Sequence, residues 1–182
     1  PQSGLDIRTL QRVATADGPE VVFAASHACR TVKGPLFRLE CEKGFITTER
    51  SAGAFAPWTV HRPGRDPEPA GEGLPRVDAF EMVERNLHGD AEAPVCTFEI
   101  AFAQTVAVNG AFLSSPIHTI PDAECENVQP EPGEDLRLAR SMNDVLDACL
   151  ERGCLPSETG LAAWSRPGRP VDVSSLTRFD LP

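Results

Sequence analysis

The sequence predicts an α+β fold: an open, mainly antiparallel β-sheet with helices packed on one face. Three observations lead to this prediction. Short apolar segments separated by tight turns fill residues 1–61, a proline-rich and glycine-rich stretch follows at 62–76, and helical periodicity marks residues 77–182. Strands followed by helices are typical of α+β proteins. We expect a single domain over residues 1–182.

The first predicted hairpin turns at Asp17-Gly18, which separates DIRTLQRVAT from EVVFAASHA. Asp-Gly is favoured where both central residues of a two-residue loop need a positive φ. Connections this short cannot cross over to a parallel neighbour, so the strands are expected to be antiparallel.

A second strand pair is expected around Lys43-Gly44. Apolar and charged residues alternate before this turn, and Phe37, Leu39 and Cys41 are expected on the buried face. The chain then continues as a strand through Glu49.

Residues 55–60, which include Trp58, are expected to add a strand, and Pro57 confines it to an edge or a bulge. The next segment, 62–76, is too dense in proline, glycine and charge for a helix or a central strand. It is predicted to be an exposed loop that ends the strand-rich part.

The first predicted helix is traced by Val77, Phe80, Val83 and Leu87, with Gly89 at the position of a C-cap. The second follows Thr97 and reads FEIAFAQTVAVNGAFLSS. Because apolar residues surround its axis, we expect it to be buried. Its Gly110 is tolerable if the small residue lets another element approach.

A loop rich in proline and acid is expected at 121–133, followed by a third helix that ends at Gly153. Arg140 and Asp144 are expected to form an i,i+4 ion pair. Ser157 is expected to cap a final short helix, ETGLAAWS, before an irregular tail. Four apolar residues at helical spacing trace the third helix: Leu138, Met142, Val145 and Cys149.

The net charge of −10 and the pI near 4.8 argue against a nucleic-acid partner, which requires clustered Lys and Arg. No apolar run approaches the ~20 residues of a membrane helix, and the N-terminus lacks the pattern of a signal peptide. We therefore expect a cytoplasmic protein with no membrane partner.

The six cysteines are spread widely, with no C-x-x-C, so neither a zinc site nor a disulfide framework is expected. Cys29, Cys41 and Cys149 are interpreted as small buried apolar residues. His27 and Cys29 share a face of an expected strand and could form a nucleophile–base pair or half a metal site, but packing is the favoured interpretation.

Gln104, Thr105 and Asn109 are the polar members of the second helix. Buried polar groups need hydrogen-bond partners, and neighbouring backbone could supply them. The alternative is that they line a pocket and bind sugar hydroxyls. His118 could contact a ligand or lie at the surface.

Three segments carry a resemblance to a known family. In order they are ADGPEVVFAASHACRTVKGPLFRLECEKGFITTE, FEIAFAQTVAVNGAFLSSPIHTIP and LPSETGLAAWSRPGRPVDVSSLTRF. They resemble the C-terminal domain of the Gfo/Idh/MocA oxidoreductases over the chain from Gly4 to Phe179.

The resemblance implies the substrate-binding and oligomerisation domain of an NAD(P)-dependent oxidoreductase acting on a sugar, sugar acid or cyclitol. It implies a sheet whose uncovered face packs against a second subunit, and hence a homo-oligomer. The small-molecule partner is a polyol or sugar, with Gln104, Asn109 and His118 as its expected contacts.

The family's N-terminal Rossmann domain, which binds NAD or NADP, has no match in these residues, and neither do its E-K-P segment with the catalytic lysine and its D-x-x-x-H helix. Gly71-Glu72-Gly73 is not a dinucleotide fingerprint, because Arg76 replaces its last glycine. We therefore expect a fragment of a longer enzyme that is inactive alone, with no catalytic, cofactor-binding or metal-binding residue of its own.

Two alternatives remain open. The chain could be a stand-alone α+β module that binds a partner protein through an exposed sheet face. It could also be a thiol-dependent enzyme that uses Cys29 or Cys154, in which case a catalytic thiolate would react rapidly with iodoacetamide.

Overall fold

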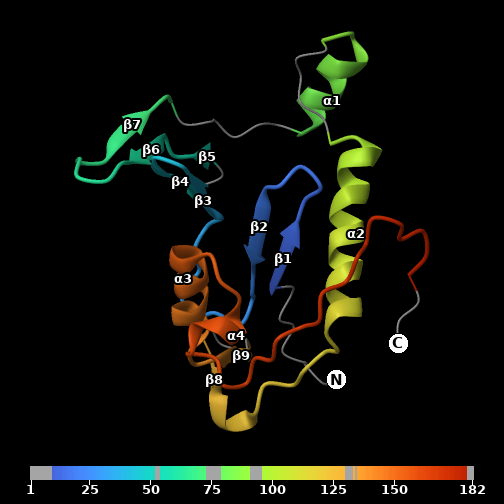
Figure 1. Ribbon diagram of the computed structural model, residues 1–182. Coiled ribbons are helices and arrows are strands. Elements are labelled where there is room, and N and C mark those ends of the chain that lie inside the picture. Colours follow the sequence, from blue (N-terminus) through green and yellow to red (C-terminus); the bar gives the residue numbers. More distant parts are fainter. Residues whose placement is uncertain are drawn as a thin grey trace. The chain divides into compact units, whose positions relative to one another are not determined.

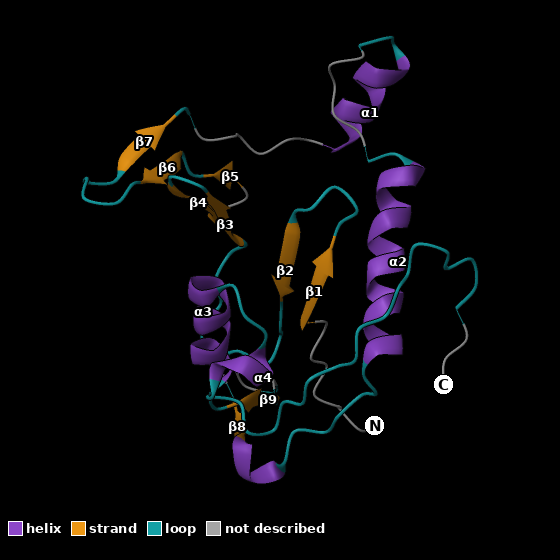
Figure 2. Cartoon of the chain, viewed as in Figure 1, coloured by secondary structure: helices purple, strands orange, loops and turns teal. Residues whose placement is uncertain are grey.

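The computed structural model describes residues 10–51, 54–72, 79–90, 96–129, 133 and 135–179. All β-ladders among them are antiparallel and four α-helices accompany them, so the fold is α+β, as predicted (Figures 1 and 2). The chain divides into two compact units, one formed by Pro1–Val32 and Glu99–Pro182 and the other by Lys33–Phe98. Each unit is described by itself.

The first unit contains a hairpin of β1 (Leu10–Ala14) and β2 (Glu20–Ala24). Gly18 has a φ of +104°, which agrees with the predicted Asp-Gly turn. The ladder ends at Ala14 and Glu20, and the Thr15 N–H donates to the Pro19 carbonyl at 3.0 Å. Residues 16–18 remain between these two, so the loop is longer than the expected two residues.

A second hairpin in this unit lies where the sequence had predicted a loop and the start of a helix. The short 3-10 helix η1 (Asp122–Glu124) leads into β8 (Cys125–Val128), which pairs with β9 (Leu136–Ala139). Leu138 is therefore a buried strand residue, and its assignment to the third helix is wrong. Cross-strand pairing overrides the helical spacing here.

The third helix, α3 (Met142–Arg152), supplies the centre of the core. Its Met142, Val145 and Cys149 are between 0% and 1% exposed, and Trp164 packs against both clusters that they form. Gly153 ends the helix in the left-handed conformation, with a φ of 58°, as predicted.

The expected ion pair between Arg140 and Asp144 is wrong. Arg140 lies in the turn before α3, and its Nη1 is 3.3 Å from Glu126 Oε2 on β8. The pairing rule of the helix surface does not apply to a residue outside the helix.

The final helix, α4 (Pro156–Thr159), is shorter and begins earlier than expected. Leu155 precedes it in place of Ser157, and the Leu155 N–H donates to Glu158 Oε2 at 2.7 Å. After Gly160 the described residues to 179 form no further helix or strand, so the predicted helix at 161–165 is wrong and the tail that follows is irregular as expected.

The second predicted helix is present as α2 (Phe98–Ser114), but its expected burial is wrong. Phe98 is 77% exposed and Ile100 59%, and Gly110 is the one buried residue of this fully described helix. The C-terminal tail packs against the second half of the helix, where Ser114 Oγ donates to the Arg169 carbonyl. A Cβ on Gly110 would lie 2.7 Å from Val173 Cγ1, which confirms that this glycine permits a close approach.

The second unit contains an antiparallel sheet, in the order β3-β4-β6-β7. A further strand, β5 (Ala54–Phe55), pairs with the end of β4, and Pro57 separates it from β6. The four strands in this order are β3 (Leu36–Cys41), β4 (Gly44–Ser51), β6 (Trp58–His61) and β7 (Glu68–Ala70). The predicted loop 62–76 thus contains a short strand, and its Pro69 is compatible with the end position of β7 in the described sheet.

The face of β3 expected to be buried is exposed, with Phe37 at 44% and Leu39 at 50%. On the alternate face, the Arg38 guanidinium lies 3.5 Å from the ring centroid of Phe45, whose ring stacks on His61. On this face the aliphatic part of Arg38 and its cation–π contact with Phe45 provide the packing that an apolar side chain would otherwise provide.

The first predicted helix is α1 (Ala79–Leu87), and Val77 lies outside the described residues. Gly89 follows with a φ of +92°, and its N–H donates to the Asn86 carbonyl. Within the described ranges, no helix is both long and apolar enough to cross a membrane.

Candidate functional site

The structure places the three predicted substrate contacts on and just after α2. Gln104 is exposed and Asn109 half-buried. They are five positions apart on a helix of 3.6 residues per turn, so their side chains leave the helix in different directions, about 140° apart. His118 is exposed, and its Nε2 lies 3.2 Å from Ser115 Oγ. Gln104 and Asn109 therefore do not lie together on one wall of a site.

A hollow of about 430 Å³ lies instead over the β8–β9 hairpin. This volume falls in the range of small-molecule sites, although the hollow is wide open. It has polar walls, formed by Asp122, Cys125, Glu126, Asn127, Arg137 and Arg140.

The register of the hairpin places Asn127 and Arg137 opposite each other on one face. Glu126 lies opposite Leu138 on the other face, where Leu138 is buried and the Glu126 side chain is only 18% exposed. Arg140 comes from the turn that follows β9.

Two groups of ion pairs organise the hollow. Glu126, whose side chain is 18% exposed, contacts both Arg140 and Arg30. Arg137 pairs with Asp122. The lining of the hollow thus holds two guanidinium groups and two carboxylates, and Arg30 adds a third guanidinium group that pairs with Glu126.

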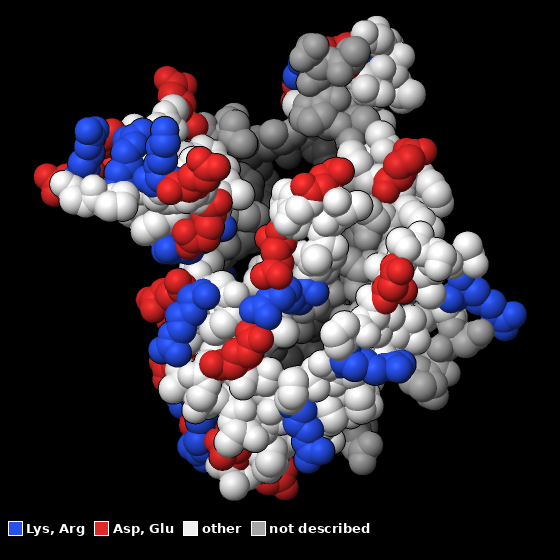
Figure 3. All heavy atoms as spheres, in the orientation of Figure 1, with Lys and Arg blue, Asp and Glu red and all other residues white. Residues whose placement is uncertain are grey.

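The surroundings of Arg137 favour its charged form. The hydrogen bond with Cys125, followed by the hydrogen bond and charge of Asp122, raises the pKa of Arg137. Over the face seen in Figure 3, acidic and basic side chains are interspersed, as expected for a surface with many short-range ion pairs.

The hollow offers fixed donors and acceptors at close range. Guanidinium groups can bind a carboxylate or phosphate in a bidentate manner, and the carboxylates and Asn127 can accept hydrogen bonds from hydroxyls. This donor set fits a hydroxylated, anionic small molecule better than an apolar one.

The described residues do not support a metal or thiol centre around His27. His27 lies after β2 and is exposed, and Cys29 Sγ donates to the Ser26 carbonyl at 3.6 Å. No group of three or more His, Cys, Asp or Glu side chains in the described part is arranged to hold a metal ion. Cys149 is buried as expected, whereas Cys41 is exposed, so its assignment to the buried face of β3 is wrong.

Sequence reasoning missed the hollow, because its residues belong to a hairpin that was read as a loop and a helix. The available signal was the pair Arg137 and Arg140 following an acid-rich segment. Comparisons with protein-family models, with curated proteins and with solved structures find no match for this chain.

Proposed function

We propose that this chain is the substrate-binding and oligomerisation domain of an NAD(P)-dependent oxidoreductase of the Gfo/Idh/MocA type, acting on a sugar, sugar acid or cyclitol. The order of the three sequence segments and the α+β fold with antiparallel sheets support the proposal. In such an enzyme the nicotinamide carries the hydride, and this domain positions the substrate. A Rossmann domain outside these 182 residues would bind the cofactor, so the chain alone is inactive.

The hollow over β8 and β9 is the observation that carries the substrate proposal. Arg137 and Arg140 would bind the carboxylate of a sugar acid, and Asp122 and Glu126 would accept hydrogen bonds from its hydroxyls. A ligand carboxylate would compete with Glu126 for Arg140, whose pair distance of 3.3 Å is longer than the usual charge-assisted hydrogen bond.

Gln104, Asn109 and His118 remain the substrate contacts that the family resemblance implies. They are alternatives to the hollow, because none of them lines it. Variants of the two sets therefore decide between two positions for the same ligand class.

Exposed apolar side chains support the oligomerisation part of the proposal. Phe37 and Leu39 lie on one face of β3, and Phe98, Ile100 and Phe102 lie on α2. Exposed clusters of large apolar residues are typical of protein interfaces. In the proposed arrangement, helices cover one face of the sheet and a second subunit packs on the other.

The test measures ligand binding to the 182-residue chain by saturation-transfer NMR, with glucuronate, glucose and myo-inositol as probes. We expect glucuronate to bind, and Arg140→Gln with Arg137→Gln to weaken its binding at least about ten-fold, the loss of a charge-assisted contact. Arg62→Gln is the matched control, since Arg62 pairs with Glu68 in the other unit.

Three results separate the possibilities. Loss of binding in Gln104→Ala and Asn109→Ala, with the arginine variant unaffected, would move the site to α2. No binding of any probe would contradict the substrate role. Binding of NADH to this chain by itself would contradict the assignment of the cofactor to another domain.

A protein-interaction module is the second candidate function, favoured by the exposure of α2. Analytical ultracentrifugation of the isolated chain over a concentration series helps to distinguish the oligomerisation domain from the interaction module. Self-association that Leu39→Glu abolishes supports the oligomerisation domain, whereas a monomer at all concentrations favours a module that needs another partner.

A further inference from the structure

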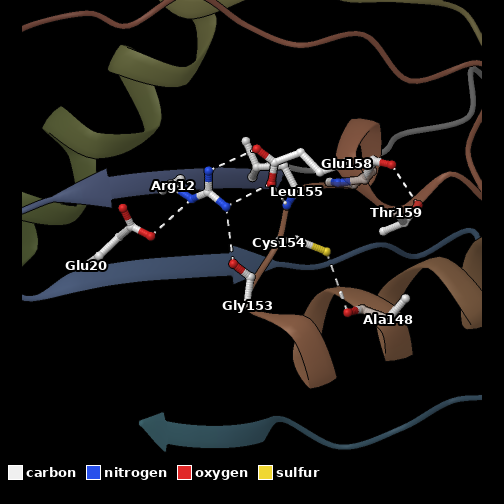
Figure 4. A network of polar contacts seen from close by, with 9 residues as sticks. Arg12, Glu20, Ala148, Gly153, Cys154, Leu155, Glu158 and Thr159 are labelled. Atoms are coloured by element: carbon white, nitrogen blue, oxygen red, sulfur yellow. Dashed lines mark hydrogen bonds and ion pairs between the residues drawn. The ribbon is translucent and has the colours of Figure 1, made fainter. Parts of the chain in front are cut away.

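The end of α3 is held by a group of contacts that we name the Arg12 clasp, formed by Arg12, Glu20, Gly153 and Glu158. Arg12 on β1 donates to both carboxylate oxygens of Glu158, at 3.0 and 2.8 Å, and to the Gly153 carbonyl at 3.2 Å. Its Nε lies 3.1 Å from Glu20 Oε1 (Figure 4).

Two cysteines flank the turn that the clasp holds. Cys149 lies in the last turns of α3, and Cys154 directly follows Gly153. The N–H groups of Gly153 and Cys154 both point back to the Cys149 carbonyl, the latter at 3.3 Å. This is the backbone geometry of a helix that ends in a left-handed glycine, in which the side chains four residues before the glycine and one residue after it commonly touch.

The side chains follow this geometry. Cys154 Sγ turns back over the helix and donates to the Ala148 carbonyl at 3.7 Å (Figure 4). The backbone hydrogen bond from the Cys154 N–H to the Cys149 carbonyl keeps the two cysteines next to each other. A disulfide joins residues whose Cα atoms lie roughly 4.4–6.8 Å apart, and a turn closed by this backbone hydrogen bond brings the two chain segments close together.

The two thiols differ in access. Cys149 is 1% exposed and lies with Val145 and Ala162 in the core, whereas Cys154 is half-buried. Burial, and then the neighbouring Cys154, raises the pKa of Cys149 to about 11. A reagent from solvent therefore meets Cys154 first, and Cys149 can act only as the second thiol.

We propose that Cys149 and Cys154 form a reversible disulfide across Gly153, with a low-molecular-weight disulfide such as oxidised glutathione as the oxidant. The Cys154 thiolate attacks one glutathione sulfur, which forms a mixed disulfide and releases one glutathione thiolate. The Cys149 thiolate then attacks Cys154 Sγ and releases the second. Two protein thiols are oxidised and one glutathione disulfide is reduced, and the two protons that the protein thiols lose are taken up by the two released glutathione thiolates.

The disulfide would tie the end of α3 to the start of α4 at the carbonyl that Arg12 binds. The disulfide and the Arg12 clasp would then hold the same turn. The disulfide is covalent and depends on the redox conditions, whereas the clasp is ionic. This site does not rest on the proposed oxidoreductase function.

The test exposes the folded 182-residue chain to oxidised glutathione and measures its intact mass. We expect a loss of about 2 Da, the two thiol hydrogens, which dithiothreitol reverses. After blocking of free thiols, trypsin locates the bond. It cuts after Arg140, Arg152 and Arg178 but not at Arg166-Pro167 or Arg169-Pro170, so the linked peptides are 141–152 and 153–178.

Variants identify the order of the two thiols. In Cys149→Ser the reaction stops at a glutathione adduct on peptide 153–178, and in Cys154→Ser the linked peptides are lost. The matched controls Cys41→Ser and Cys96→Ser remove exposed thiols and leave the linked peptides unchanged.

The measurement on the unsubstituted chain decides the matter even where Cys149→Ser does not fold. Adducts at Cys41 and Cys96 without any linkage of 141–152 to 153–178 would overturn the proposal. Linkage that forms only in urea, where all thiols are accessible, would overturn it as well.

Discussion

Arg12 and Glu158 join the first hairpin to the last helix through a bidentate ion pair, with N–O distances of 3.0 and 2.8 Å. The two residues are 146 positions apart in the sequence. Their side chains are 32% and 43% exposed, so solvent screens the pair. Its value to the fold lies in fixing one hairpin against α4.

Glu158→Gln is expected to lower the free energy of unfolding by about 1 kcal/mol at neutral pH, the upper end for an exposed ion pair of good geometry. The glutamine can still accept a hydrogen bond, so the loss reports charge. Urea unfolding followed by circular dichroism measures it. Glu151→Gln, at an exposed position near the end of α3, is the matched control and should change stability little. Equal losses in both variants would contradict a specific role of the clasp.

The same pair predicts a pH dependence. The Leu155 N–H, and then Arg12, hydrogen-bond the Glu158 carboxylate and hold its pKa below the ordinary value of 4.5. A group whose pKa falls on folding adds stability above its unfolded pKa and loses it as the pH falls through the folded one. The stability difference between the native chain and Glu158→Gln should therefore be constant near neutrality and shrink below about pH 4.5. A difference that grows on acidification would contradict the assignment.

Gly110 and Val173 make a prediction about the tail. Alanine at Gly110 favours the helix by about 1 kcal/mol, but its Cβ would lie 2.7 Å from Val173 Cγ1, so the tail has to move. We expect Gly110→Ala alone to give no net stabilisation and faster proteolysis of the tail after Arg178. In a Val173→Ala background the same change should stabilise the chain. A double-mutant cycle measures the coupling, and additive effects would contradict the contact.

Local backbone requirements were predictable from the sequence, and non-local pairing was not. Gly18, Gly110 and Gly153 were correctly placed, because a positive φ or a close approach depends on the residue itself. Leu138 was misassigned, because its spacing to Met142 fits a helix and only the partner strand β8 reveals the hairpin.

Burial failed for the same reason. The apolar faces of β3 and α2 were expected to be buried, but they are exposed. The residue pattern identifies an apolar face and does not identify the element that packs against it. The hollow was missed because Glu126 and Arg140 meet only after β8 and β9 have paired.

Gly44 gives the sharpest test of the sheet. It has a φ of +141°, and a Cβ there would lie 2.0 Å from the His61 carbonyl oxygen on β6. Backbone atoms of a paired strand cannot move aside without breaking the ladder. Gly44→Ala should therefore destabilise the sheet by more than the ~1–3 kcal/mol of backbone strain alone.

Gly64→Ala is the matched control, because Gly64 also has a positive φ, +70°, but no atom lies within 4 Å of its Cβ position. It should lose only the cost of the left-handed conformation, about 1–2 kcal/mol. Fluorescence of Trp58 on β6, in a Trp164→Phe background common to both variants, follows unfolding of this unit. Similar losses in the two glycine variants would mean that β4 and β6 do not pair in the register that places Phe45 opposite His61.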